Sequence, residues 1–156
     1  MNRAVVAVAA ALALSTPAAV LADPSPETVE QLRQPVVDPG AQSQYHRGVR
    51  ARVMKDWAAA EAAFRQAIVQ QPTFADAWNE LGYALRNQRR YGESVDAYHE
   101  ALRLRPDFPE ALEYLGEAYV QMGKLAEAQA ILDRLRPLDP REAEELAKVI
   151  AAASKR

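Results

Sequence analysis

The two histidines are the side chains of this sequence best suited to acid–base or metal chemistry near neutral pH. His46 and His99 lie far apart along the chain. Neither has a second histidine four residues away or a glutamate placed as in a zinc-binding helix. We therefore interpret both as solvated or packed side chains and predict no metal site.

Covalent catalysis also lacks a suitable side chain. The chain contains no cysteine, which excludes thiol catalysis, cysteine-ligated zinc and disulfide bonds. None of its serines stands in a nucleophile-elbow pattern, and its six dispersed glycines form no phosphate-binding loop. The acidic residues show no paired-carboxylate signature. These features predict a protein that is not an enzyme, with no cofactor and no small-molecule substrate.

Length and charge narrow the class of protein further. The 156 residues predict one domain. Nineteen basic and 21 acidic side chains give a formal charge of −2, whereas nucleic-acid-binding domains usually carry a basic stripe or a high pI. The composition therefore predicts a globular protein that does not bind nucleic acid.

The first 22 residues have the pattern of a secretory signal peptide. A positive start at Arg3 is followed by an Ala-rich apolar run over 4–14, and Val20 and Ala22 supply the small side chains of a cleavage site. The alternative is an uncleaved membrane anchor, but a spanning helix needs about 20 apolar residues and Pro17 interrupts this run. We expect an exported bacterial protein, cleaved after Ala22, that is periplasmic or secreted and keeps no stable membrane anchor.

Residues 23–40 form the expected linker, because they hold four of the ten prolines. Proline removes a backbone donor and biases the preceding residue away from helix. We expect a tether with at most one short helix, beginning near Ser25 and ended by Pro35.

A 34-residue period organises the rest of the chain. Three glycines and three prolines each recur at this spacing, namely Gly48, Gly82 and Gly116, and Pro72, Pro106 and Pro140. Small and large apolar residues recur in register between them. A fixed period of this length predicts stacked supersecondary units.

The central unit supplies a physical reason for these columns. Trp78 and Leu85 belong to an apolar stripe at helical spacing. Gly82 lies in the same stripe, although glycine costs about 1 kcal/mol relative to alanine inside a helix. We therefore expect a second helix to approach closely there, with small residues such as Ser94 and Ala97 facing the glycine.

These columns resemble the tetratricopeptide repeat family. The family pattern, Trp–x2–Leu–Gly–x2–Tyr, then Ala–x3–Phe, then Pro, is matched in the central unit by Trp78, Leu81, Gly82, Leu85, Ser94, Tyr98 and Pro106. The third unit matches in register, whereas the first has a polar opening helix. The resemblance implies an all-α, right-handed α-solenoid of three helix–turn–helix repeats, at 41–74, 75–108 and 109–142. A C-terminal capping helix at 141–156 would follow.

In this family the first helix of each repeat lines a concave groove that binds peptides. By that resemblance the groove residues are those opposite the packing stripe: Tyr45, Val49, Arg52, Asn79, Tyr83, Arg86, Glu113 and Glu117. Tyr83 is the most informative, because it is an aromatic side chain on a face that packing does not require. A solvated face without a ligand is the alternative for any one of them.

The expected groove is basic and aromatic at the first unit and acidic at the third. Family members that bind C-terminal carboxylates use lysine, asparagine and arginine there. Asn79 is suitable, but the other such positions hold Tyr45 and Val49 in the first unit and Glu113 and Glu117 in the third. The resemblance thus implies a periplasmic adaptor or scaffold, monomeric or weakly oligomeric, that binds a protein or peptide without an anion site. The alternative is a self-associating structural protein of an envelope assembly.

Overall fold

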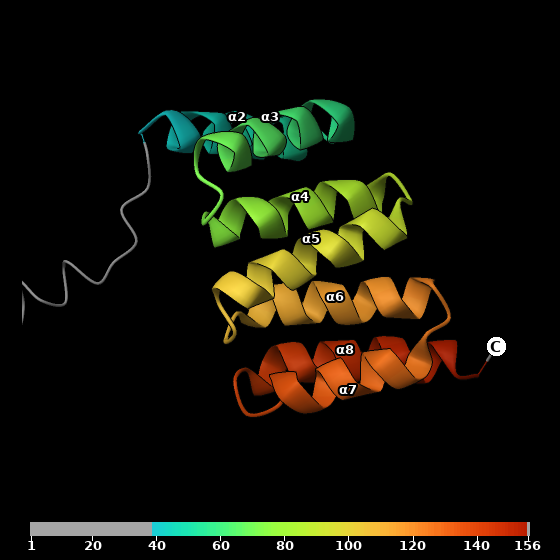
Figure 1. Ribbon diagram of the computed structural model, residues 1–156. Helices are drawn as coiled ribbons and strands as arrows, with labels where there is room; N and C mark the ends of the chain where they lie inside the picture. Colours follow the sequence, from blue (N-terminus) through green and yellow to red (C-terminus); the bar gives the residue numbers. More distant parts are fainter. Residues whose placement is uncertain (1–38, 156) are drawn as a thin grey trace, which may run out of the picture. The chain divides into compact units, whose positions relative to one another are not determined.

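The computed structural model describes residues 39–155, and all regular structure in that range is α-helical (Figure 1). The helices are α2 (Pro39–Val53), α3 (Trp57–Gln70), α4 (Ala75–Asn87), α5 (Tyr91–Leu104), α6 (Pro109–Gln121), α7 (Leu125–Leu135) and α8 (Pro140–Ala153). The expected all-α fold is confirmed. The expected signal peptide and the linker up to residue 38 lie outside the described residues.

The helices pair in chain order. α2 packs on α3, α4 on α5, and α6 on α7, while α3 meets α4 and α5 meets α6 between successive pairs (Figure 1). The first helices also contact one another, α2 with α4 and α4 with α6. This arrangement is an α-solenoid in which α2, α4 and α6 share one side. None of the described helices is long and apolar enough to cross a membrane.

Local sequence explains where several helices begin. Asp56 caps α3, because its carboxylate accepts from the Ala59 amide at 3.0 Å. Asp139 caps α8 in the same way, and Pro140 follows it at the first helical position, where a missing N–H costs nothing. Helix α2 includes Pro39 and Gly40, which the sequence had assigned to the linker, because proline is tolerated in a first turn.

The three periodic glycines are all buried at helix contacts, and large side chains cover them. A Cβ at Gly48 would lie 2.4 Å from the Phe64 ring, and one at Gly82 would lie 2.6 Å from the Tyr98 ring. The expectation that small residues face Gly82 was therefore only half right. Ser94 does reach it, since its hydroxyl donates to the Gly82 carbonyl at 2.8 Å, but an aromatic ring fills the space.

The third glycine has a different neighbour. A Cβ at Gly116 would lie 2.5 Å from a methyl carbon of Leu146 on α8. Leu146 is fully buried, and α8 packs on both α6 and α7. Helix α8 therefore closes the apolar face of the last helix pair.

Trp78 joins the two apolar clusters of the core. Its ring packs against residues of both, and its indole N–H donates to the Pro72 carbonyl at 2.9 Å. The bond fixes the turn between α3 and α4. Trp78 thus supports the fold, as its place in the packing stripe predicted.

Candidate binding groove

A pocket of about 320 Å³ opens on the side shared by α2, α4 and α6. The lining residues, called the groove pocket below, are Tyr45, Arg52, Asp76, Asn79, Glu80, Arg105, Phe108, Glu110 and Tyr114. Most are related by the repeat, because residues 34 positions apart occupy equivalent places on successive first helices. Arg105 and Phe108 are exceptions that come from the turn between α5 and α6.

Both cations of the groove pocket are engaged by its own carboxylates. The Arg105 guanidinium donates two hydrogen bonds to Asp76, at 2.6 and 3.0 Å, and lies 4.2 Å from the centre of the Phe108 ring. The Arg52 Nε lies 3.1 Å from Oε2 of Glu80. The positive charge of each guanidinium is therefore balanced by a carboxylate of the groove pocket itself.

Three buried polar atoms of the groove pocket have no hydrogen-bond partner among the described residues: Asn79 Oδ1, Glu80 Oε2 and Arg52 Nε. Asn79 is only 5% exposed, and its Oδ1 has no hydrogen-bond partner among the described residues. The buried Glu80 Oε2 forms the ion pair with Arg52 but no hydrogen bond. Burial raises the pKa of Glu80 above its usual range. Such buried acceptors are costly unless a ligand or water supplies the donor.

Burial acts on Tyr45 in the same direction. Burial, with the negative charges of Glu80 and Asp76, raises the pKa of Tyr45 to about 12. The Tyr45 ring also packs 5.0 Å from that of Phe74. Tyr45 is therefore a neutral, firmly held wall of the groove pocket at physiological pH.

Tyr83 is the centre of a neighbouring cluster of rings and guanidinium groups. Its ring lies 5.9 Å from Trp57 and 5.2 Å from Tyr114, measured between ring centres. Arg52 and Arg86 place their guanidinium carbons 5.6 and 5.3 Å from the centre of the Tyr83 ring. Tyr83 thus contacts side chains of the first and third helix pairs, which its sequence position alone did not indicate.

The acidic end of the groove is partly neutralised from within. Arg86 forms a short ion pair with Glu117 across α4 and α6. Burial and the neighbouring carboxylates of Glu142 and Glu117 raise the pKa of Glu113 to about 8.

The sequence-predicted groove residues fall into three groups. Tyr45, Arg52 and Asn79 line the groove pocket. Tyr83, Arg86 and Glu117 form the cluster beside it, and Glu113 lies at the contact with α8. Val49 packs against the apolar core instead.

Asp76 and Glu110 also line the groove pocket, on the helix faces that the sequence assigned to the groove. The other four lining residues were not selected from sequence: Glu80, Arg105, Phe108 and Tyr114. Glu80 and Tyr114 share one repeat column, directly after Asn79 and Glu113, so the period could have identified them. Arg105 and Phe108 carry no such signal, because they belong to a turn whose path the period does not determine.

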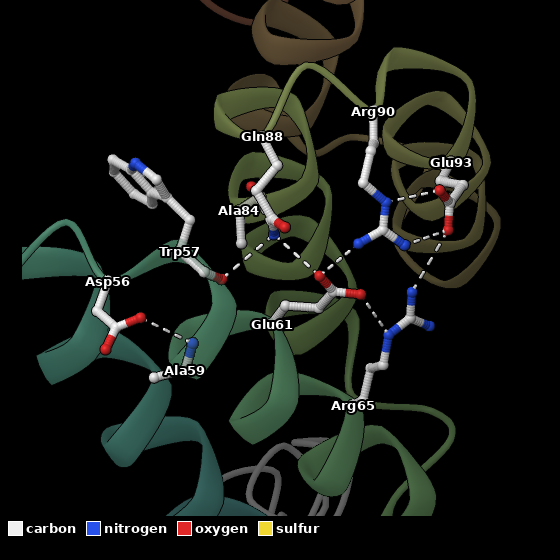
Figure 2. A network of polar contacts seen from close by, with 9 residues as sticks. All are labelled: Asp56, Trp57, Ala59, Glu61, Arg65, Ala84, Gln88, Arg90 and Glu93. Atoms are coloured by element: carbon white, nitrogen blue, oxygen red, sulfur yellow. Dashed lines mark hydrogen bonds and ion pairs between the residues drawn. The ribbon is translucent and has the colours of Figure 1, made fainter.

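Away from the groove pocket, a polar network joins α3, α4 and α5 (Figure 2). The Glu61 carboxylate accepts hydrogen bonds from Gln88 at 2.9 Å, Arg90 at 2.6 Å and Arg65 at 2.9 Å. Arg90 also donates to Glu93 at 2.5 and 2.7 Å. Burial alone would raise the pKa of Glu61, but the three donated bonds outweigh it and lower that pKa. The network holds the first two helix pairs together.

The described part of the chain was expected to lack a metal site, and the positions of its acidic and histidine side chains bear on this expectation. Within residues 39–155, no three His, Cys, Asp or Glu side chains gather as metal ligands would. His46 accepts or donates one bond with Gln42 at 2.8 Å, and His99 one with the Tyr119 hydroxyl at 3.0 Å. Both histidines are exposed surface residues, as predicted.

Comparison with protein families gives two matches, both to models described as tetratricopeptide repeat. They cover residues 45–98 and 85–153. Among curated proteins, a TPR repeat-containing protein of Pseudomonas aeruginosa is 37% identical over 89 residues, which is 56% of this chain and 15% of that protein. The peroxisomal targeting signal receptor of Candida albicans is 42% identical over 65 residues, 42% of this chain and 11% of the receptor. The matched region thus spans a small part of both relatives.

Solved structures show the same fold. The TPR2B domain of yeast Sti1, in complex with an Hsp70 peptide, superimposes with a TM-score of 0.71 at 22% identity. The alignment covers 76% of this chain and 98% of that domain. The first TPR of Spaghetti (RPAP3), bound to the HSP90 peptide SRMEEVD, gives a TM-score of 0.70 at 20% identity, covering 76% and 97% of the two chains.

Proposed function

Since the chain contains tetratricopeptide repeats, we propose that it is a non-catalytic interaction module that binds a peptide or helix of another protein in the groove along α2, α4 and α6. The main support is the groove pocket, where Asn79 is almost fully buried and its side-chain oxygen has no hydrogen-bond donor among the described residues. An extended segment supplies such donors from its backbone and side chains. The peptide complexes of the structural relatives support the proposal.

The proposed place of action is the bacterial periplasm. The support is the signal-peptide pattern of residues 1–22, with cleavage after Ala22. We expect the intact mass of the protein purified from a periplasmic fraction to correspond to a chain that begins at Asp23. A mass that retains Met1 would contradict export by cleavage and favour an anchored protein.

The alternative of a self-associating structural protein has weaker support. The last residue of α2, Val53, and the next residue, Met54, are exposed, at 73% and 80% of their surface. However, the end of the array formed by α2 presents polar groups, among them a hydrogen bond from Arg47 to Gln44 at 3.1 Å. We propose a monomer or weak oligomer that binds other proteins.

A capture experiment with a matched pair of variants tests the binding function. The immobilised mature protein, residues 23–156, is incubated with periplasmic extract of the source organism, and bound proteins are identified by mass spectrometry. Asn79→Leu removes the unpaired oxygen at similar side-chain volume, whereas Asp96→Asn changes an exposed residue on α5 outside the groove pocket. We expect a partner that is retained by the parent and by Asp96→Asn but lost with Asn79→Leu. Equal capture by all three would contradict binding in the groove.

A further inference from the structure

We propose that the groove pocket selects a cationic side chain, arginine or lysine, of the bound segment. This inference rests on the proposed function and names the chemistry of the ligand. It follows from three properties of the pocket: its charge balance, the buried Asn79 oxygen that lacks a donor, and its aromatic walls.

The charge balance of the groove pocket is negative. Two cations, Arg52 and Arg105, face three carboxylates, Asp76, Glu80 and Glu110. The two cations are paired with Glu80 and Asp76. Glu110 is exposed and forms no ion pair within the described part of the chain. One carboxylate is therefore available to a ligand cation.

The hydrogen-bonding capacity of the pocket points the same way. Asn79 Oδ1 is a buried acceptor without a donor, and Glu80 Oε2 is held only by its ion pair with Arg52 at 3.1 Å, without a hydrogen bond. A guanidinium offers five N–H donors and an ammonium three, and neither group has an acceptor. A carboxylate ligand would instead add a further negative charge beside Glu80 and Glu110. Bonds in which the donor or the acceptor is charged are also stronger than neutral ones.

The walls of the pocket suit a cation as well. Tyr45, Phe108 and Tyr114 present aromatic rings, and cations are attracted to ring faces within about 6 Å. The protein already uses two of these rings in this way, since Arg105 lies 4.2 Å from the centre of Phe108 and Arg86 lies 5.3 Å from that of Tyr114. The volume of about 320 Å³ leaves room for one side chain of a ligand.

The test is selection from a randomised library of octapeptides, acetylated and amidated so that their ends carry no charge. The bait is the mature protein, residues 23–156. We expect arginine or lysine to be enriched at one position of the bound peptides. Replacing that residue by norleucine should weaken binding about tenfold, as measured by fluorescence polarisation, because a charge-assisted bond and a ring contact are lost.

Two groove variants connect the preference to the pocket. Glu110→Gln should reduce the advantage of the cationic peptide over its norleucine analogue. Arg105→Gln should increase that advantage, because it frees Asp76 for the ligand. Asp96→Asn, outside the pocket, is the control and should leave the advantage unchanged.

The outcomes separate the inference from the function on which it rests. Peptides that bind with enrichment of acidic or apolar residues would overturn the cationic selectivity and leave the interaction module intact. If Asp96→Asn and Glu110→Gln reduced the advantage of the cationic peptide equally, the cationic selectivity of the pocket would also be overturned. The preference would then reflect the net charge of the whole protein. A library that yields no bound peptide would overturn both.

Discussion

Gly82 and Gly92 differ in how much space surrounds their missing side chains. A Cβ at Gly82 would lie 2.6 Å from the Tyr98 ring, whereas nothing lies within 4 Å of a Cβ at Gly92. We expect Gly82→Ala to lower the free energy of unfolding by about 1–3 kcal/mol through overpacking. Gly92→Ala should raise it by about 0.5–1 kcal/mol, because alanine favours the helix.

Urea denaturation of the two variants checks this pair. Both substitutions add the same methyl group to a helix, so a difference in sign isolates the close contact between α4 and α5. If Gly82→Ala were as stable as the parent, the Tyr98 ring would have room to move and the glycine column would not mark a tight contact.

The raised pKa of Glu113 predicts that the free energy of unfolding falls as the pH rises. Its pKa is raised to about 8 in the folded protein, from an ordinary value of 4.5. Between these values the folded state holds a proton that the unfolded state has lost, so stability falls as the pH rises toward 8. Glu113→Gln imitates the protonated form. We expect the variant to match the parent near pH 5 and to exceed it at pH 8.5, by on the order of 1 kcal/mol after solvent screening.

Thermal melts of parent and variant at each pH provide the measurement. Comparing the two proteins at one pH removes the contribution of other groups, including Glu61, whose lowered pKa acts with the opposite sign. A constant difference between parent and variant from pH 5 to 8.5 would contradict the raised pKa of Glu113.

At the scale of elements, the turns within the three helix pairs use one backbone conformation with different residues. Lys55, Arg89 and Gly123 stand 34 positions apart and have φ values of 58°, 62° and 73°. This left-handed region is strained for side chains other than glycine. We expect Lys55→Gly and Arg89→Gly each to stabilise the protein by about 0.5–1 kcal/mol, and Gly123→Ala to destabilise it by about 1 kcal/mol.

Chemical denaturation of these three single variants tests whether the left-handed conformation of these turns is strained for residues other than glycine. Lys55 and Arg89 form no ion pair within residues 39–155, so the glycine substitutions remove little besides strain. Destabilisation by both glycine variants would instead mean that the extra conformational entropy of glycine in the unfolded chain outweighs the relief of backbone strain in these turns.

The elements themselves were accessible from sequence because the period records them directly. Gly82, Trp78 and Pro106 mark a close contact, a packing stripe and a helix end, and each has a local physical cause. The large neighbours of the glycines were less accessible, since spacing shows where two helices approach but not which side chain lies between them. Phe64 and Tyr98 do recur in register, yet their rings reach the glycines only through the crossing of the helices.

The groove was predictable in part for the same reason. Tyr45 and Asn79 are related by the repeat and were found, whereas Arg105 and Phe108 enter from a turn. The pairing of Arg52 with Glu80 was also hidden, because it depends on the distance between two helices that are not adjacent in sequence. From sequence alone the groove is therefore predicted to be basic at its first unit, whereas in the structure the Arg52 charge is balanced by Glu80.

At the scale of the whole molecule, stability should depend on the last helix of the array. Arrays of repeats are held together by contacts between neighbouring units, so damage at one end weakens the nearest unit most. Leu146 of α8 is fully buried over Gly116, and among the helices of residues 39–155 α8 contacts α6 and α7 alone. We expect Leu146→Ala to cost about 2–5 kcal/mol, as for other large-to-small core changes. The exposed Lys148, on the same helix, gives a matched control in Lys148→Ala.

Hydrogen exchange of the backbone amides distinguishes a local from a global effect of Leu146→Ala. If the units are coupled only through their neighbours, protection should fall most in α6, α7 and α8 and least in α2 and α3. Glu110 and Tyr114 line the groove pocket from α6, so protection on that side of the pocket should fall. The Arg52–Glu80 pair between α2 and α4 should persist. Equal loss of protection in every helix would show instead that the array unfolds as one cooperative unit, with the groove formed or lost as a whole.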